Sequence, residues 1–369
     1  MKLYWRKEKV YHWVKQCLAT TGKGPFMQNP KIRNMEEFAK ASGISRPTVS
    51  KYFQDPMSVR RSTRERIETA LRTYDYQPNI YAMNQNRRRT NSIGIIVPNL
   101  ADPFFTEIGR VVELACIDAG YSPIVRSSHG KPAQETANLE ALKALKPAGI
   151  LLAPFGRASD RDHVRAFAET VPMVLFDADI EEAGAAFVGT DNVQSIGLMT
   201  DYLCRTGEPP CLFEMRTPLN PNANKRRLAY LAGMERHGHE PRIVHAEGSG
   251  WSIEEFGLRE GRRLLEDGAF PSRTILCSND RLAIGLLSAA FGLGIKVGHG
   301  SDCELRIAGH DDHPFSRFTC PSLTTIAQDY GAIAELAVQQ IAQVIETESM
   351  PCEREISLFD GKLVMRESA

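Results

Sequence analysis

The apolar positions between residues 34 and 43 recur at the spacing of a short helix. They follow Asn34 directly and comprise Met35, Phe38 and Ala39. Glu37 stands three residues after Asn34, which is the spacing of a capping box, and Gly43 is a residue type that commonly ends helices. The pattern predicts a first helix from Met35 to Gly43.

A second helical pattern covers the stretch SGISRPTVSKYFQ at residues 42–54, although it contains a proline. Proline is tolerated in the first turn of a helix, where its missing N–H would have no intrahelical partner. A helix that is capped by Ser45 and starts at Arg46 places Pro47 in that turn. We therefore predict a second helix that runs to about Phe53.

A third helix is predicted to open at Ser62, because Glu65 completes another capping box. Its apolar positions are Ile67, Ala70, Leu71 and Tyr74. Two helices joined by a glycine turn, with a third packed across them, form a helix-turn-helix unit. The second helix of such a unit would present outward Arg46, Pro47, Thr48, Ser50 and Lys51. Arg and Lys can read guanine edges in a DNA major groove, but a three-helix protein-binding module remains an alternative.

From about residue 92 the pattern changes to short apolar runs that alternate with helical stretches. The runs are SIGIIVP, AGILLAP, PMVLFD, PCLFEM, RTILCS and LRIAG. Repeated strand–helix units predict an α/β fold with parallel sheets that are covered by helices on both faces. Ligands bind such sheets in the loops at the carboxyl ends of the strands.

Polar and aromatic residues follow several of these predicted strands. They include Asp102, Phe104, Phe105, Asp177, Asp191, Asn279, Asp280 and Asp311, with Arg227 at a predicted helix start. Arginine and carboxylates can bracket the hydroxyls of a sugar, and an aromatic ring can pack on its apolar face. Asp191 fits a structural helix cap equally well, and one of the two phenylalanines is expected to belong to the core.

The chain has no net charge, but its charges are unevenly distributed. Residues 1–89 hold 19 Lys and Arg against 7 Asp and Glu, and residues 90–369 carry the opposite excess of 12. A basic head indicates a polyanionic partner, either nucleic acid or an anionic membrane surface.

No apolar run approaches the ~18–20 residues that span a bilayer, and the N-terminal residues lack the pattern of a secretory signal. The eight cysteines show no paired spacing. We therefore expect a cytoplasmic protein with reduced thiols and no membrane partner.

The segments ASGISRPTVSKYF, STRERIETAL, YQPNIYA and RRT..IGIIVPN.ADPFF follow one another in the order seen in a known family, and LTTI and LVMRES follow near the C-terminus. The chain closely resembles the lac repressor/purine repressor (LacI/GalR) family of bacterial transcription regulators over about residues 30–369. Nothing in the family matches residues 1–29, which we interpret either as an extension or as the result of a start codon placed too far upstream.

The resemblance implies roles in DNA binding for the head. The base-reading residues would be Arg46, Pro47 and Lys51. The phosphate contacts would be Ser45, Thr48, Ser50, Arg87, Arg88 and Arg89. A hinge helix that orders on DNA would include Asn79, Ala82, Met83 and Gln85. The family usually has a leucine at the position of Gln85, and a polar side chain there argues against a minor-groove wedge unless Met83 takes that role.

The resemblance also implies a core like that of periplasmic sugar-binding proteins, in which two subdomains close on a small-molecule effector. The effector pocket would include Phe104 or Phe105, Arg227, Asn279 and Asp311, with Trp251 as an aromatic stacking residue. Asp177 and Asp191 are added because they follow predicted strands. The implied effector is a carbohydrate.

The expected domain order is an extension at 1–29, a helix-turn-helix domain at 30–77, a hinge and linker at 78–91, and an effector-binding core at 92–369. Within that core, the first subdomain is expected at about 92–189 and 323–349, and the second at about 190–322 and 350–369.

The predicted function is that of a homodimeric repressor that binds a near-palindromic DNA operator and responds to an effector. No cofactor or metal is expected. The sequence has no nucleophile elbow, phosphate loop or HExxH pattern, so we do not expect an enzyme. A sugar receptor with a vestigial head and an enzyme that uses the cleft carboxylates are the alternatives.

Overall fold

A computed structural model of the chain describes residues 32–54, 56–74, 76–77, 89–218, 220–248, 250–349, 351 and 353–369. The chain divides into two compact units, Met1–Arg87 and Arg88–Ala369. We refer to the described part of the first as the headpiece and to the second as the core.

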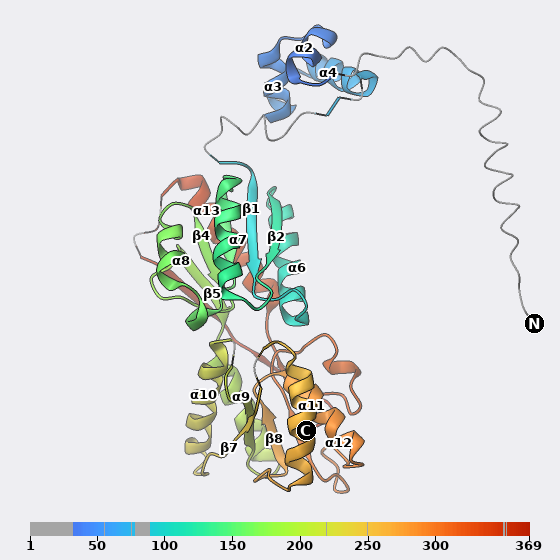
Figure 1. The fold of residues 1–369 in the computed structure, drawn as a ribbon, viewed down its shortest axis with the longest axis vertical. Helices are drawn as coiled ribbons and strands as arrows, with labels where there is room; N and C mark the ends of the chain where they lie inside the picture. The colour runs from blue at the N-terminus through green and yellow to red at the C-terminus, as the bar shows by residue number, and fades with distance from the viewer. Residues whose placement is uncertain are drawn as a thin grey trace, which may run out of the picture. The chain divides into compact units, whose positions relative to one another are not determined.

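The headpiece consists of α2 (Met35–Ser42), α3 (Arg46–Gln54), the 3-10 turn η1 (Pro56–Ser58) and α4 (Arg61–Tyr74) (Figure 1). Phe38, Val49 and Ile67, one from each α-helix, are fully buried against one another. Tyr76 closes this small core by stacking on Phe38, with 4.7 Å between the ring centroids. The three-helix arrangement that we predicted is therefore confirmed.

The first two helices begin as the sequence indicates. The Asn34 side chain accepts a hydrogen bond from the Glu37 N–H at 2.9 Å. Gly43 ends α2 in the left-handed region, with φ of 65°, where a side chain would be strained. Pro47 is the second residue of α3, so the proline lies in the first turn.

The predicted start of the third helix is wrong by one residue. Helix α4 begins at Arg61, and the Arg60 carbonyl accepts from the N–H groups of Thr63 and Arg64 at 2.9 and 3.0 Å. Ser62 therefore lies inside the first turn and does not cap the helix.

The first subdomain of the core is built on a six-stranded parallel sheet with the order β11-β5-β4-β3-β1-β2. Its strands are β1 (Ser92–Val97), β2 (Ser122–Ser127), β3 (Gly149–Leu152), β4 (Met173–Phe176), β5 (Ala186–Thr190) and β11 (Glu355–Phe359). Its helices are α6 (Pro103–Asp118), α7 (Pro132–Ala144), α8 (Arg161–Ala168) and α13 (Tyr330–Thr347), with the turn η2 (Gly156–Ala158).

Alternation along the strands explains why helices cover both faces of this sheet. Ile95 of β1 packs with residues of α6 and α13, whereas its neighbour Ile96 packs with residues of α7 and α8. Both side chains are fully buried. A strand that is apolar on both faces reads as a continuous apolar run, as expected for a buried parallel sheet.

The second subdomain contains a four-stranded parallel sheet with the order β7-β6-β8-β9 and a two-stranded antiparallel sheet of β10 and β12. The strands are β6 (Cys211–Met215), β7 (Ile243–Ala246), β8 (Thr274–Cys277), β9 (Arg306–Ala308), β10 (Thr325–Ala327) and β12 (Lys362–Val364). The helices are α9 (Asn192–Thr206), α10 (Asn222–Arg236), α11 (Ile253–Glu266) and α12 (Asp280–Gly292), with the turn η3 (Ser316–Phe318). One face of the larger sheet packs on α9 and α10 and the other on α11 and α12.

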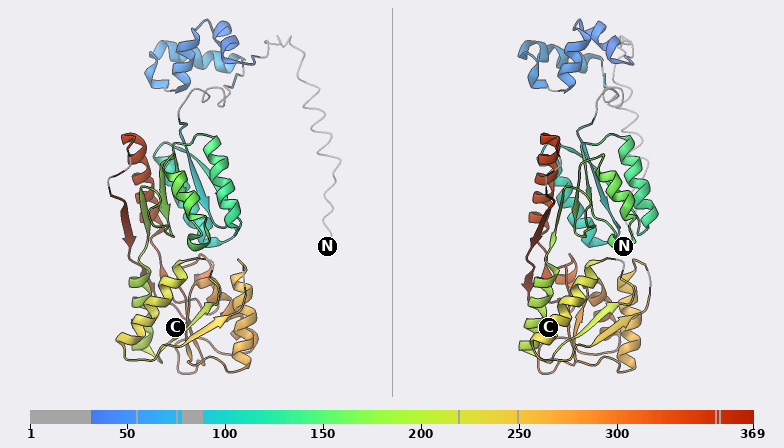
Figure 2. Two further views of the ribbon diagram at one scale, coloured as in Figure 1. Left: turned by 60° about the vertical axis from the view of Figure 1, so that its left-hand side comes forward. Right: turned by 90° about the vertical axis from the view of Figure 1, so that its left-hand side faces the viewer.

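The chain crosses between the subdomains three times within the described residues: between β5 and α9, between β10 and α13, and between β11 and β12 (Figures 1 and 2). The carboxyl ends of strands from both sheets therefore meet at the junction of the two subdomains, where the sequence predicts a ligand.

Two of the expected subdomain boundaries are wrong. Strand β11 pairs with β5 in the first sheet, with Glu355 beside Ala186, so residues 355–359 do not belong to the second subdomain. Residues 325–327 form β10, which pairs with β12 and so joins the second subdomain. Both errors concern short strands whose partners lie far away along the sequence.

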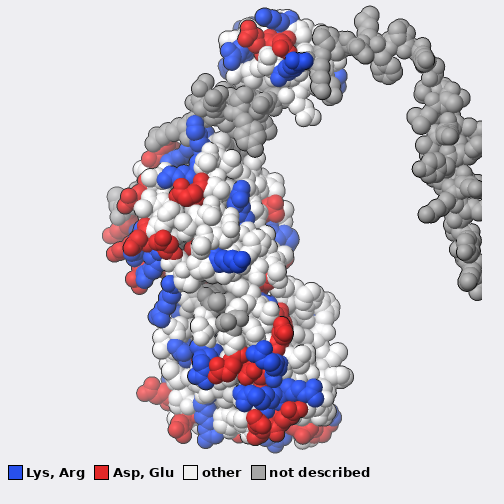
Figure 3. All heavy atoms as spheres, in the orientation of Figure 1, with Lys and Arg blue, Asp and Glu red and all other residues white. Residues whose placement is uncertain are grey.

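Acidic and basic side chains intermingle over the face of the core drawn in Figure 3, so that face has no extended patch of one sign. Among the described residues, no helix is both long enough and apolar enough to span a bilayer.

Candidate functional site

Helix α3 is the predicted DNA-recognition helix, and the side chains predicted to contact DNA on it and directly before it are largely accessible. Ser45, Arg46, Pro47 and Lys51 are exposed, and Thr48 and Ser50 are half-buried. Val49 points the other way and is fully buried, which fixes the rotation of α3 about its axis. The Ser45 hydroxyl lies 2.8 Å from the Thr48 hydroxyl and accepts weakly from the Thr48 N–H at 3.4 Å.

The four predicted hinge residues lie outside the described residues: Asn79, Ala82, Met83 and Gln85. Two of the predicted phosphate contacts, Arg87 and Arg88, lie outside them as well. Arg89 is described and is half-buried.

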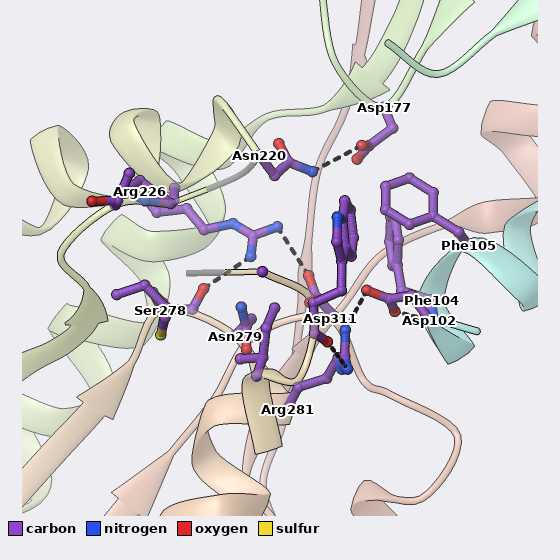
Figure 4. A pocket seen from close by; sticks show the side chains of 17 residues that line it. Asp102, Phe104, Phe105, Asp177, Asn220, Arg226, Ser278, Asn279, Arg281 and Asp311 are labelled. Atoms are coloured by element: carbon purple, nitrogen blue, oxygen red, sulfur yellow. Dashed lines mark hydrogen bonds and ion pairs between the residues drawn. The ribbon is translucent and has the colours of Figure 1, made fainter. Parts of the chain in front are cut away.

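A cavity of about 70 Å³ lies at the junction of the two subdomains (Figure 4). Six of the eight predicted effector residues line it: Phe104, Phe105, Asp177, Trp251, Asn279 and Asp311. They come from loops that follow strands in both sheets, apart from the two phenylalanines at the start of α6. Asp102, Asn220, Arg226 and Arg281 also line the cavity.

One buried ion pair of the cavity joins Arg226 of α10 to Asp311. The Arg226 Nη2 donates to Asp311 Oδ1 at 2.9 Å, and its other nitrogens donate to the Asn192 side chain and to the Ser278 carbonyl at 2.8 and 2.9 Å. Burial alone would raise the pKa of Asp311, but Arg226 and the His310 ring hold it below its ordinary value. Asp311 is therefore a buried carboxylate.

A second ion pair crosses the cleft. The Arg281 Nη1 on α12 donates to Asp102 Oδ2 in the first subdomain at 2.8 Å. Arg281 also donates to both Glu254 carboxylate oxygens, at 2.7 and 2.6 Å, and to the Trp251 carbonyl at 2.6 Å. Burial raises the pKa of Asp102, although the Arg281 charge opposes that shift.

Asp177 is the third carboxylate of the cavity and differs from the other two. It accepts hydrogen bonds at 3.1 Å from the amide groups of Asn220 and Asn222 in the second subdomain, and no ion pair is found for it among the described residues. Burial raises its pKa to about 7. Its backbone has a φ of 62°, in the left-handed region where Asp is better tolerated than most residues.

Aromatic rings form the apolar wall of the cavity. Phe104 and Phe105 are both buried and meet edge to face, with 4.9 Å between centroids. Trp251 packs edge-on against Phe105 and Phe155 of the first subdomain, at 5.9 and 6.2 Å. The Trp251 Nε1 is buried and has no hydrogen-bond partner among the described residues.

Two predicted effector residues lie outside the cavity lining. Arg227 points toward the buried Glu214, with 3.3 Å between Nη1 and Oε1, because one residue along a helix is a rotation of about 100°. Asp191 caps α9 by accepting from the N–H groups of Val193 and Gln194, both at 2.9 Å. The structure favours the helix-cap alternative for Asp191.

Little in the sequence indicated that Arg226 and Arg281 belong to the site. Arg226 is the neighbour of the residue that we predicted, and helical phase relative to the second sheet distinguishes the two. Arg281 directly follows the predicted pair Asn279 and Asp280, so its position near the carboxyl end of β8 was the available signal.

The buried network extends from Asp311 toward the crossovers. The His310 Nδ1 lies 2.9 Å from Asp311 Oδ1, and its Nε2 lies 3.0 Å from the Ser195 hydroxyl. Gln328 donates to Asp311 at 2.8 Å and accepts from Thr190 at 2.5 Å. Although Asp311, His310 and Ser195 have the order of a hydrolytic triad, His310 and Ser195 are fully buried, so a substrate has no access to that hydroxyl.

No group of three or more His, Cys, Asp or Glu side chains in the described ranges is placed to hold a metal ion. The six cysteines within those ranges are free thiols.

Comparisons with known proteins agree with this two-part architecture. Residues 34–79 match the signature of bacterial regulatory proteins of the lacI family, and residues 201–369 match that of the periplasmic binding protein-like domain. The chain combines a lacI-family DNA-binding domain with a periplasmic-binding-protein-like domain. It is therefore a DNA-binding transcription regulator with a helix-turn-helix unit and a periplasmic-binding-protein-like core.

Two curated relatives match nearly the whole chain. The NTD biosynthesis operon regulator NtdR of Bacillus subtilis (strain 168) is 27% identical over 336 residues, which is 90% of this chain and 99% of that protein. The ribose operon repressor of Escherichia coli (strain K12) is 25% identical over 327 residues, or 88% and 96% of the two chains. Both relatives are regulators of operons.

Solved structures show the same fold. The lac repressor dimer bound to operator and the anti-inducer ONPF is 22% identical, with a TM-score of 0.77, and the match covers 92% of this chain and 99% of that one. A LacI family regulator from Enterococcus faecium with bound ribose is 20% identical, with a TM-score of 0.64 and coverage of 75% and 98%.

Proposed function

We propose that this lacI-family regulator is a homodimeric repressor whose affinity for a near-palindromic operator is modulated by a carbohydrate effector. The observation that carries this proposal is a polar cavity between two subdomains in a chain that also bears a helix-turn-helix headpiece. Two headpieces would place one recognition helix on each half-site of the operator.

On the DNA side, the exposed side chains of α3 would enter the major groove. Arg46 and Lys51 would donate to guanine edges, and Pro47, which has no N–H, would make an apolar contact such as one with a thymine methyl. The hydroxyls of Ser45, Thr48 and Ser50 would contact phosphates, as would Arg87, Arg88 and Arg89.

The hinge proposal concerns residues that follow the headpiece. Asn79 would cap a short helix that also contains Ala82 and forms when the dimer docks. Because Gln85 is polar, an apolar wedge in the minor groove would have to come from Met83.

On the effector side, the cavity has the chemistry that a sugar requires. Arg226, Asn279 and Asp311 would bind hydroxyls, and the aromatic wall of Phe104, Phe105 and Trp251 would pack on the apolar ring face. The relative from Enterococcus faecium has bound ribose, which supports a sugar as the ligand class. Arg226 replaces Arg227 in this proposal, and Asp191 is omitted.

The two sites would be linked through the arrangement of the two subdomains. The effector contacts both subdomains, so it favours one arrangement, and operator DNA would favour one as well. Each ligand then changes the affinity for the other by the same factor.

The DNA assignment is tested by fluorescence anisotropy with a near-palindromic duplex from the region upstream of the protein's own gene. Replacing Arg46 and Lys51 together by Ala should weaken specific binding by about 2–6 kcal/mol, since each base contact contributes about 1–3 kcal/mol. Lys40→Ala is the matched control, because Lys40 is an exposed basic residue of α2 that lies outside the recognition helix. Equal affinities of the double variant and the control would refute the assignment.

The effector assignment is tested by adding pentoses, hexoses and polyols to the preformed complex. A sugar that stabilises the protein should also change the operator affinity. Sugar binding by a protein that never binds a specific duplex would instead support the receptor alternative.

A further inference from the structure

We infer that the effector is a compact polyhydroxylated molecule without an anionic group, and that the cavity discriminates against sugars that carry a phosphate or carboxylate group. This inference rests on the proposed function and narrows its ligand class. The charge balance of the cavity carries it. Among the described lining residues, three carboxylates (Asp102, Asp177 and Asp311) face two guanidinium groups (Arg226 and Arg281).

The positive charge of Arg226 is already neutralised within the protein. Its ion pair with Asp311 is buried, and its Nε and Nη1 donate to the Asn192 side chain and the Ser278 carbonyl, which leaves two of its five N–H groups for ligand hydroxyls. An anionic ligand would have to displace the Asp311 carboxylate to pair with this guanidinium. The displaced carboxylate would then be buried without a cation, which is strongly unfavourable.

The positive charge of Arg281 is also neutralised within the protein, because Arg281 lies between two acidic residues. Asp102 and Glu254 both accept from it, at 2.8 and 2.6 Å. With two carboxylates on one guanidinium, this corner of the cavity is already negative. A phosphate added there would meet like charge at close range in a site with little water, where Coulomb interactions are strong.

Asp177, whose pKa burial raises to about 7, adds a negative charge above that pH, and it forms no ion pair within the described ranges. Only the amide groups of Asn220 and Asn222 donate to its carboxylate among the described residues. Ligand hydroxyls would satisfy the remaining lone pairs of this carboxylate, because a hydroxyl donates a hydrogen bond and carries no charge. A phosphate or carboxylate beside Asp177 offers acceptors where donors are needed.

The size of the cavity fits a small sugar. The volume of about 70 Å³ is far below the ~300–1,000 Å³ of pockets for drug-sized ligands, so a compact ligand is expected. The inference therefore selects a monosaccharide or small polyol over a phosphorylated sugar.

The experiment measures binding of matched pairs to the full-length protein by isothermal titration calorimetry at pH 8, where Asp177 is ionised. D-ribose is compared with D-ribose 5-phosphate, D-glucose with D-glucose 6-phosphate and D-glucuronate, and D-galactose with D-galacturonate. For any sugar that binds, the anionic partner should bind at least 100-fold more weakly. An anionic member that binds as tightly as its neutral partner, or more tightly, overturns the inference.

A variant tests the source of the discrimination. Asp177→Asn removes the carboxylate that has no basic partner and should reduce the ratio between neutral and anionic affinities at least fivefold. Asp162→Asn is the control, because Asp162 is a fully accessible carboxylate of α8, and its ratio should not change. An unchanged ratio in Asp177→Asn would exclude Asp177 as the cause, and the wild-type comparison stands even if that variant does not fold.

The outcomes separate this inference from the proposed function. If an anionic sugar binds best and alters operator affinity, the proposed function survives and the charge argument fails. If no sugar of either class binds or affects the operator complex, the carbohydrate assignment fails and the charge argument fails with it.

Discussion

At the residue scale, Asp177 combines a buried carboxylate, a left-handed backbone and two amide donors from the opposite subdomain. Burial raises its pKa to about 7. In the unfolded chain the same carboxyl would titrate near 3.8. The folded state therefore keeps a proton between these two pH values that the unfolded state has lost.

The stability consequence of Asp177 has a defined sign. Because the folded state binds the extra proton, the free energy of unfolding should fall as the pH rises from about 4 to about 7 and then level off. Between pH 5 and pH 7 the loss amounts to about 2–3 kcal/mol, at about 1.4 kcal/mol per pH unit.

Comparing the wild type with Asp177→Asn by urea unfolding at pH 5, 6, 7 and 8 isolates this contribution. The comparison is needed because burial lowers the pKa of His310 to about 4, which gives the wild type an opposite slope between about pH 4 and 6.5. The free energy of unfolding of the wild type minus that of Asp177→Asn should be about 2–3 kcal/mol larger at pH 5 than at pH 8. Parallel stability profiles would contradict the protonation of buried Asp177.

At the element scale, helix α9 begins at the first crossover and is capped there by Asp191. Its first turn also approaches the third crossover, because Gln194 accepts from the Gly361 N–H at 2.9 Å. Through Ser195 and His310, the same helix connects to Asp311 in the cavity. The start of α9 therefore joins two crossovers to the candidate effector site.

The role of Asp191 can be tested by replacing it. Asp191→Ala should lower the free energy of unfolding by about 1 kcal/mol, because two N–H groups lose their acceptor. Asp191→Ser, which retains a capping oxygen, should lose less. Effector affinity should stay within twofold of wild type in calorimetry. Loss of effector binding without loss of stability would instead restore Asp191 as an effector residue.

At the scale of the whole core, Gly130 of the first subdomain lies directly against the Trp251 ring of the second subdomain on one side of the cleft. A β-carbon on Gly130 would lie 2.2 Å from the Trp251 ring. Gly120 has a similar left-handed backbone, with φ of 83° against 71°, but a β-carbon there would meet nothing within 4 Å. The two glycines therefore form a matched pair.

Gly130→Ala should weaken effector binding at least tenfold and increase the radius of gyration measured by small-angle scattering in the presence of effector, because the added methyl group prevents this approach of the subdomains. Gly120→Ala carries the same backbone strain, of about 1–2 kcal/mol. In this control variant the two subdomains should still close on the effector as in the wild type. If both variants bind the effector equally well, the Gly130–Trp251 contact does not limit closure.

Much of the architecture could be predicted from local patterns. The Asn34 cap, the Gly43 stop and the phase of α3 around Pro47 depend on residues within a few positions of each other. The apolar runs of β1, β3, β4, β6 and β8 could be recognised because both of their faces are buried. Strands β2, β7 and β11 were missed because they carry exposed or half-exposed residues that interrupt the apolar run. Strand β9 is also an edge strand, but its Ile307 and Ala308 are fully buried.

The sequence by itself determined the three-helix headpiece, the α/β class of the core and the strand ends where a ligand site is expected, because caps, periodicity and strand burial are local properties. Only the tertiary structure decided that Arg226 and not Arg227 meets Asp311, that Arg281 crosses the cleft to Asp102, and that β11 returns to the first sheet. Those contacts join residues 85, 179 and about 170 positions apart. No local pattern encodes them, since they depend on how the two sheets are connected and how each helix is rotated against its sheet.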